Sequence, residues 1–127
     1  MQTRKDLDQL SRLRQALREH LRDLENSLDV VFGRAPMVKG NVYELARKCG
    51  KPNCACARGE LHRSMVLTWS EEGKHRIFPV PAERLADLQA KSEEYLRFRR
   101  TRARVTEICK KILGVMDRIE KLRREEP

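Results

Sequence analysis

Apolar residues recur with a regular spacing near the start of the chain, and this spacing limits what the segment can fold into. Gaps of three and four residues alternate from position 7 to position 31, which is the heptad pattern of a helix that packs along another helix. The pattern comprises Leu7, Leu10, Leu17, Leu21, Leu24, Leu28 and Val31, with Arg14 at its one polar position. We therefore predict a helix over about residues 3–31, paired either with the C-terminal helix of the same chain or with another chain.

A second long helix is predicted at the other end of the sequence. Residues 82–124 contain no proline and a single glycine, Gly114. The second half of this segment carries its own stripe with three-four spacing, formed by Val105, Ile108, Ile112, Val115, Ile119 and Leu122. The apolar residues of the first half follow a different phase, so the stripe changes face near Phe98. We interpret Cys109 as packing on the late stripe and His20, on the polar side of the first helix, as solvated.

Between the helices lie three short β-prone runs, around residues 42–45, 65–69 and 75–80. The connection 70–74 is short and contains a glycine, which predicts an antiparallel hairpin. The expected fold class is α+β, with a long N-terminal helix, a small three-stranded antiparallel sheet with a zinc-binding turn, and a long C-terminal helix that pairs with the first like a coiled coil. We expect a heptad helix over 1–32, a zinc-binding β region over 33–81 and a basic helix over 82–127, all in one structural unit.

Four potential metal ligands are concentrated in one short segment with the spacing C-x4-C-x-C-x5-H. They are Cys49, Cys54, Cys56 and His62. Zinc takes four nitrogen or sulfur ligands in a tetrahedron, and Gly50, Pro52 and Gly59 provide the chain reversals that such a site needs. We predict a structural Zn²⁺ held by these four residues. Unligated buried cysteines, redox chemistry and an iron–sulfur cluster are the alternatives, and His75 is an alternative to His62 as the fourth ligand.

The sequence has no apolar run of membrane length and no secretory leader at its start. We therefore expect a cytoplasmic protein that does not contact a membrane. In that reducing compartment the cysteines stay reduced and available to a metal.

Residues 49–62, CGKPNCACARGELH, resemble the signature of an uncharacterised family of small bacterial and archaeal proteins. That family, a domain of unknown function, has a CGKPxCxCxxGxxH-type core and is often encoded in or near mobile genetic elements. The resemblance is strongest over residues 40–98 and leaves the first helix outside. It implies that the three cysteines and His62 are the family's motif positions, and it implies no activity. The run 63–65 departs from the Gly-Pro-aromatic sequence expected there.

Basic residues outnumber acidic ones, with 28 Lys and Arg against 19 Asp and Glu and a net charge of +9. A polyanionic partner is therefore expected, namely duplex DNA or structured RNA. The predicted contacts are a cluster in the long helix and the residues that flank the metal ligands. They are Arg97, Arg99, Arg100, Arg102 and Arg104, together with Lys48, Lys51, Arg58 and Arg63. Alternatively, the helix arginines pair with Asp23, Glu25 or Asp29 on a packed first helix.

These observations favour a zinc-stabilised nucleic-acid-binding accessory or regulatory protein linked to a mobile element. The alternative is a protein–protein adaptor whose helices form a homodimer or bind a recombinase, transposase or other helical partner. An enzyme is not expected, because the sequence shows no phosphate-binding loop, paired catalytic carboxylates or nucleophile–base pair.

Overall fold

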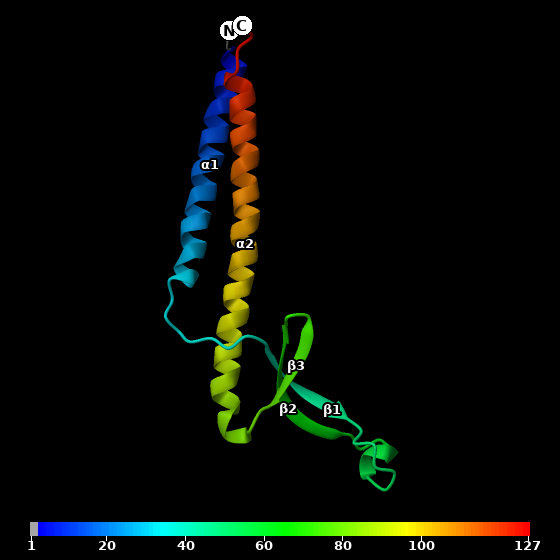
Figure 1. Ribbon diagram of the computed structural model, residues 1–127. Coiled ribbons are helices and arrows are strands. Elements are labelled where there is room, and N and C mark those ends of the chain that lie inside the picture. Colours follow the sequence, from blue (N-terminus) through cyan, green and yellow to red (C-terminus); the bar gives the residue numbers. More distant parts are fainter. Residues whose placement is uncertain (1–2) are drawn as a thin grey trace. The chain divides into compact units, whose positions relative to one another are not determined.

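The computed structural model describes residues 3–127, which form two long helices and a small sheet (Figure 1). The elements are α1 (Arg4–Val31), β1 (Asn41–Arg47), β2 (His62–Glu71), β3 (Lys74–Pro79) and α2 (Leu85–Arg123), with short 3-10 helices at Ala55–Arg58 and Ala82–Arg84. The predicted α+β class is confirmed. The chain divides into two compact units, one formed by the residues up to Gly33 together with Phe98–Pro127 and the other by Arg34–Arg97. Helix α2 contributes to both units, and the division falls where its apolar stripe changes face.

Helix α1 begins with a reciprocal pair of hydrogen bonds at its N-terminus. The backbone N–H of Asp6 donates to Oγ1 of Thr3 over 3.1 Å, and the N–H of Thr3 donates to Oδ2 of Asp6 over 3.2 Å. This capping box satisfies donors that the first helical turn leaves unpaired. At the other end Gly33 donates to the carbonyl of Val30 over 3.2 Å, and the helix stops there.

In the first unit, α1 packs against the second half of α2, so the predicted seam closes within one chain. The two helices run antiparallel, so the start of α1 and the end of α2 lie at the same end of the pair (Figure 1). The core between the helices contains three buried apolar side chains, Leu10 of α1 and Ile108 and Val115 of α2. The rest of the late α2 stripe is half-buried. The predicted stripe of α2 is therefore correct.

The predicted face of α1 is only half right. The observed stripe keeps every other predicted residue, and in between it contains the residue that directly precedes the predicted one. Leu7 and Leu21 are 53% and 45% exposed, and Arg14 is exposed. The stripe that is buried or half-buried comprises Leu10, Leu13, Leu17, His20, Leu24, Ser27 and Val31. The predicted phase would have placed the charge of Arg14 between the helices, which costs more than placing His20 and Ser27 there.

Two single-residue interpretations are also wrong for this reason. His20 lies half-buried on the packed face of α1, whereas a solvated position was expected. Cys109 is exposed, because it follows the buried Ile108 by one residue and is turned about 100° away from the seam.

The sheet of the second unit has the order β1-β2-β3 with both pairs antiparallel. Glu71 pairs with Lys74, so β2 and β3 are joined by a two-residue turn. Both residues of that turn, Glu72 and Gly73, have positive φ angles, of 52° and 77°. A turn of this kind matches the twist of the two strands, and the predicted hairpin is confirmed.

The early turns of α2 hold the chain segment that leads into β1. Oγ of Ser92 donates to the carbonyl of Gly40 over 2.8 Å, and the N–H of Val38 donates to the carbonyl of Lys91 over 3.1 Å. Gly40 has a φ of 125°, and a Cβ there would lie 2.5 Å from the carbonyl oxygen of Thr68, so only glycine fits. The small core of this unit contains Val66, Leu67 and Leu88.

Replacing Leu10 and Leu21 separately by alanine tests the observed phase of α1. Leu10→Ala should lower the free energy of unfolding by about 3 kcal/mol, because it leaves a cavity between the helices. Leu21→Ala should cost less than about 1 kcal/mol, because that side chain is largely exposed. Urea unfolding followed by circular dichroism measures both. If both variants lowered the free energy of unfolding equally, the observed packing would be wrong and the stripe predicted from the sequence would be right.

Candidate metal centre

The ladder between β1 and β2 brings the two ends of loop 48–61 together. Its last pair is Arg47 with His62, so the first residue of β2 lies beside the last residue of β1. Cys49 follows two positions after Arg47, at the start of the loop. Sheet register alone therefore places Cys49 and His62 near one another.

The interior of the loop is folded by local backbone hydrogen bonds. The N–H of Cys54 donates to the carbonyl of Lys51 over 3.2 Å, and the N–H of Ala57 donates to the carbonyl of Cys54 over 3.0 Å. Cys54 thus begins the 3-10 helix that carries Cys56. Gly59 ends that helix with a φ of 103°, a conformation that favours glycine. These turns direct two cysteines toward the strand ends.

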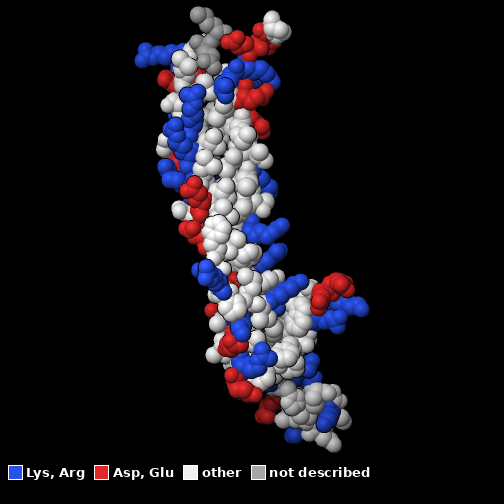
Figure 2. Space-filling model, turned by 60° about the vertical axis from the view of Figure 1, so that its left-hand side comes forward, with Lys and Arg blue, Asp and Glu red and all other residues white. Residues whose placement is uncertain are grey.

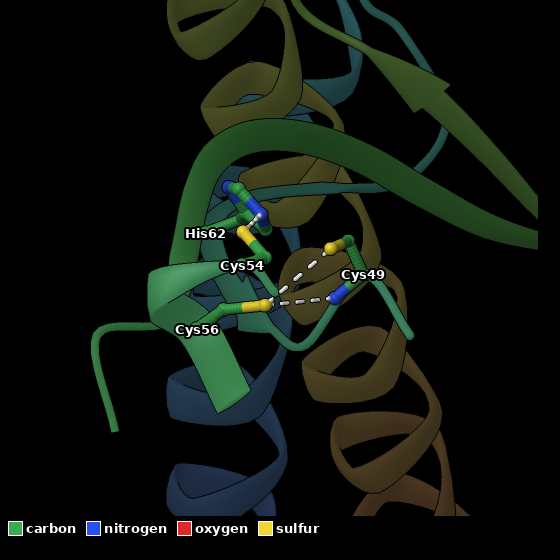
Figure 3. Close-up of side chains that lie close together, drawn as sticks. All are labelled: Cys49, Cys54, Cys56 and His62. Atoms are coloured by element: carbon green, nitrogen blue, oxygen red, sulfur yellow. Dashed lines mark hydrogen bonds between the residues drawn. The ribbon is translucent and has the colours of Figure 1, made fainter. Parts of the chain in front are cut away.

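The four side chains converge from the start of the loop, from its 3-10 helix with the preceding Cys54, and from the first residue of β2 (Figure 3). Their ligand atoms all lie within 4.8 Å of one another. Sγ of Cys49 and Sγ of Cys56 are 3.4 Å apart, and Sγ of Cys54 lies 3.1 Å from Nε2 of His62. A tetrahedral zinc ion with ordinary bond lengths would separate its ligand atoms by about 3.6–3.8 Å. The donor set and its spacing therefore fit a metal ion that takes three thiolates and one imidazole.

Two thiols of the cluster have pKa values that shift in opposite directions. The pKa of Cys49 is lowered, first by a backbone hydrogen bond at Lys51 and then by the thiol of Cys56. The N–H of Cys49 donates to Sγ of Cys56 over 3.3 Å and favours its thiolate, but burial and the neighbouring thiols outweigh this and raise the pKa of Cys56. Crowding of several thiols opposes full ionisation, and a bound cation would relieve that repulsion.

A basic cavity of about 690 Å³ adjoins the cluster. Arg47, Lys48 and Lys51 line it together with Ser64 and three of the four cluster residues. The fourth, Cys56, is only 1% exposed and does not line it. Three cations beside the cluster suit a centre in which three thiolates and a divalent metal would carry a net negative charge. Arg47 was not predicted as a contact residue, although it directly precedes Lys48 in the sequence.

The other residues predicted for this region neither line the cavity nor belong to the cluster. Nη1 of Arg63 forms an ion pair with Oε1 of Glu44 at 3.0 Å, across the β1–β2 ladder. Arg58 is exposed on the 3-10 helix and does not line the cavity. His75 pairs with Ser70 in the β2–β3 ladder, about 26 Å along β2 from His62, so His62 is the histidine at the cluster.

All five predicted arginines of α2 are exposed. Arg97 lies 3.5 Å from Glu94 on the preceding turn. Over residues 3–127, no ion pair joins Arg99, Arg100, Arg102 or Arg104 to a carboxylate. The alternative in which Asp23, Glu25 or Asp29 neutralises these four arginines is thus not what the structure shows.

The fold and the cluster define a small α+β protein with a possible Cys/His metal centre at one end of its sheet. The chain belongs to the family described as Domain of unknown function (DUF6788), whose sequence profile matches residues 7–90. The match includes the four cluster residues and most of α1, so the expectation that the first helix lies outside the family is wrong. Neither a curated protein nor a solved structure matches the chain. Within residues 3–127, neither helix is long and apolar enough to cross a membrane.

Metal content tests the centre directly. The protein purified without chelator should carry one metal ion per chain, and Cys54→Ser should lose it because the site then has only three strong ligands. Cys109→Ser is the matched control and should keep the metal, since Cys109 lies on α2 outside the cluster. Native mass spectrometry counts the ions. Metal-free wild-type protein, or equal losses in both variants, would contradict the assignment.

Proposed function

We propose that the protein is a non-enzymatic, zinc-stabilised nucleic-acid-binding accessory protein that acts with a mobile genetic element. The observation that supports it most is the set of exposed arginines on α2 that have no carboxylate partner among the described residues. Like charges spaced three and four residues apart on a helix repel one another, so a polyanion that binds them would also stabilise the helix. The phosphate backbone of duplex DNA or structured RNA supplies such a charge.

Zinc is the metal that the donor set favours, because thiolates and imidazole are its usual ligands in structural sites. With four protein ligands the ion has no free position for a water or a substrate, so its role is architectural. The ion would link the end of β1, the 3-10 helix and the start of β2. Its binding free energy would then contribute to the folding of the loop.

The basic cavity offers a second contact for phosphate in the unit that contains the sheet. Lys48 and Lys51, both predicted as contacts, line it with Arg47. Arg63 is less available, because Glu44 already holds its guanidinium. Contacts of this kind provide affinity and orientation and carry little sequence specificity.

An adaptor is the second candidate, and one observation favours it. Leu7, Leu21, Leu113 and Met116 are all large apolar side chains exposed by roughly half. In an antiparallel pair the residues that directly follow the seam positions of both helices lie on the same side, so these four share one face. Figure 2 shows an uncharged band along the helical pair, with charged side chains of both signs on its borders. A second copy of the chain, or a helical partner such as a recombinase or transposase, would fit this face.

Titrating a DNA duplex at several salt concentrations tests the leading proposal. The affinity should fall steeply with salt, with a slope of log affinity against log salt of about −0.9 for each phosphate contact. The triple variant Arg97→Ala, Arg100→Ala and Arg104→Ala should bind more weakly and show a shallower slope.

The matched control removes three arginines of α1, Arg14, Arg18 and Arg22, and so lowers the net charge equally. It should keep most of the affinity and the slope. Wild-type protein that does not bind duplex DNA or RNA, or that binds it independently of salt, would favour the adaptor.

A further inference from the structure

Helix α2 carries a row of basic residues that extends well beyond its arginine cluster. The row follows the three-four spacing directly beside the seam and is formed by Arg100, Arg104, Glu107, Lys111, Gly114, Arg118 and Lys121. All seven are exposed, and five of them are cationic. We call these seven residues the basic row. Arg99 and Arg102 lie on the opposite side of the seam and do not belong to it.

The charge of the basic row is not neutralised within its own unit. Its single carboxylate, Glu107, forms an ion pair of 3.2 Å with Lys110, which lies outside the row. In the part of the chain that the structure describes, no ion pair involves the five cations of the row. Mutual repulsion along one helix face therefore remains until an external anion binds.

A groove at the C-terminal end of the row brings in a cation from the other helix. Arg118 and Lys121 line a hollow of about 470 Å³ together with Gln9 and Arg12 of α1. Leu13 and Leu122 from the seam complete the lining. Three cations and one amide thus surround a space large enough for a phosphate group, and no carboxylate lines it.

Gly114 is an independent sign that something approaches this face closely. Glycine in a helix interior is less favourable than alanine, so it needs a reason. A Cβ at position 114 would meet no atom within 4 Å, so packing inside the protein does not require the glycine. Because it lies between Lys111 and Arg118 on the row, a glycine allows an external backbone to reach the helix surface there.

We propose that the basic row is the track along which a nucleic-acid duplex lies, with Gly114 as the point of closest approach and the Arg12–Arg118–Lys121 groove holding a phosphate at its end. From Arg100 to Lys121 the row extends about 32 Å at 1.5 Å per residue, close to the 34–36 Å of one turn of B-DNA. This proposal rests on the proposed nucleic-acid function. It retains Arg100 and Arg104 from the arginine cluster, adds Lys111, Arg118 and Lys121, and removes Arg99 and Arg102.

Two double variants of the protein separate the effect of where the cations lie from the effect of the net charge. Lys111→Ala with Arg118→Ala removes two cations of the row. Arg18→Ala with Arg123→Ala removes two exposed cations from the other side of the seam and leaves the ion pair between Glu107 and Lys110 intact. Binding to a duplex of about 20 base pairs, two helical turns, is measured across salt concentrations by fluorescence anisotropy.

The row variant should lose affinity and lower the salt slope by about 2, since each phosphate contact that is lost lowers it by about 1. The control should leave the slope nearly unchanged. Equal effects of the two variants would overturn the proposal. Circular dichroism confirms that both variants remain helical, so loss of folding does not imitate loss of binding.

Gly114→Ala provides a measurement in which stability and binding move in opposite directions. The melting temperature should rise, because alanine is the better helix former. Affinity for the duplex should fall, because the new methyl group occupies the point of closest approach. A variant that is more stable and binds as well as the wild type would overturn the role of Gly114.

The outcomes also distinguish this proposal from the proposed function. If the wild-type protein binds the duplex and depends on Arg97, Arg100 and Arg104, but the row and control variants behave alike, nucleic-acid binding stands and the extended row is wrong. If the wild-type protein does not bind the duplex, both fail together.

Discussion

The convergence of three thiols and one imidazole at the end of a two-stranded ladder is the constraint on which the loop and the sheet depend. The ligand atoms lie within 4.8 Å of one another, so several thiolates there would repel each other strongly unless a cation bound between them. The core beneath the sheet is small, with Val66, Leu67 and Leu88 as its buried apolar side chains. A metal that joins the loop just after β1 to the first residue of β2 would therefore stabilise a region that apolar burial alone supports weakly.

The helical unit is stabilised differently. Its antiparallel seam buries one stripe of each helix and leaves distinct surfaces on its two sides, an apolar band on one and the basic row on the other. These surfaces suit different partners, since a band of leucines fits another protein and a row of cations fits a polyanion. The family match ends at residue 90, before the basic row begins at Arg100, so the match does not cover the row.

Most of the fold follows from the sequence, because long periodic stripes and turn residues dictate the elements directly. The sequence does not determine which face of α1 is buried, because Leu10, Leu17 and Leu24 belong to both possible stripes. Packing against α2 determines that Leu13 is half-buried and Arg14 exposed. Cys109 shows the same limit, because a shift of one residue turns a side chain by about 100°. The clustering of Cys49, Cys54, Cys56 and His62 was predictable from their spacing. The choice of His62 over His75 and the pairing of Arg63 with Glu44 depend on the register of β1 with β2, which local sequence does not specify.

Hydrogen exchange, measured with the metal bound and after its removal by a chelator, tests most directly whether the metal centre holds the sheet together. Amides near the ends of the ladder at Arg47 and His62 should exchange faster once the metal is removed, as should those of the 3-10 helix at Ala55–Arg58. Amides of the α1–α2 seam should keep their protection, because apolar packing maintains it. Unchanged exchange in β1, β2 and the loop after complete removal of the metal would contradict the central role given to the four ligands.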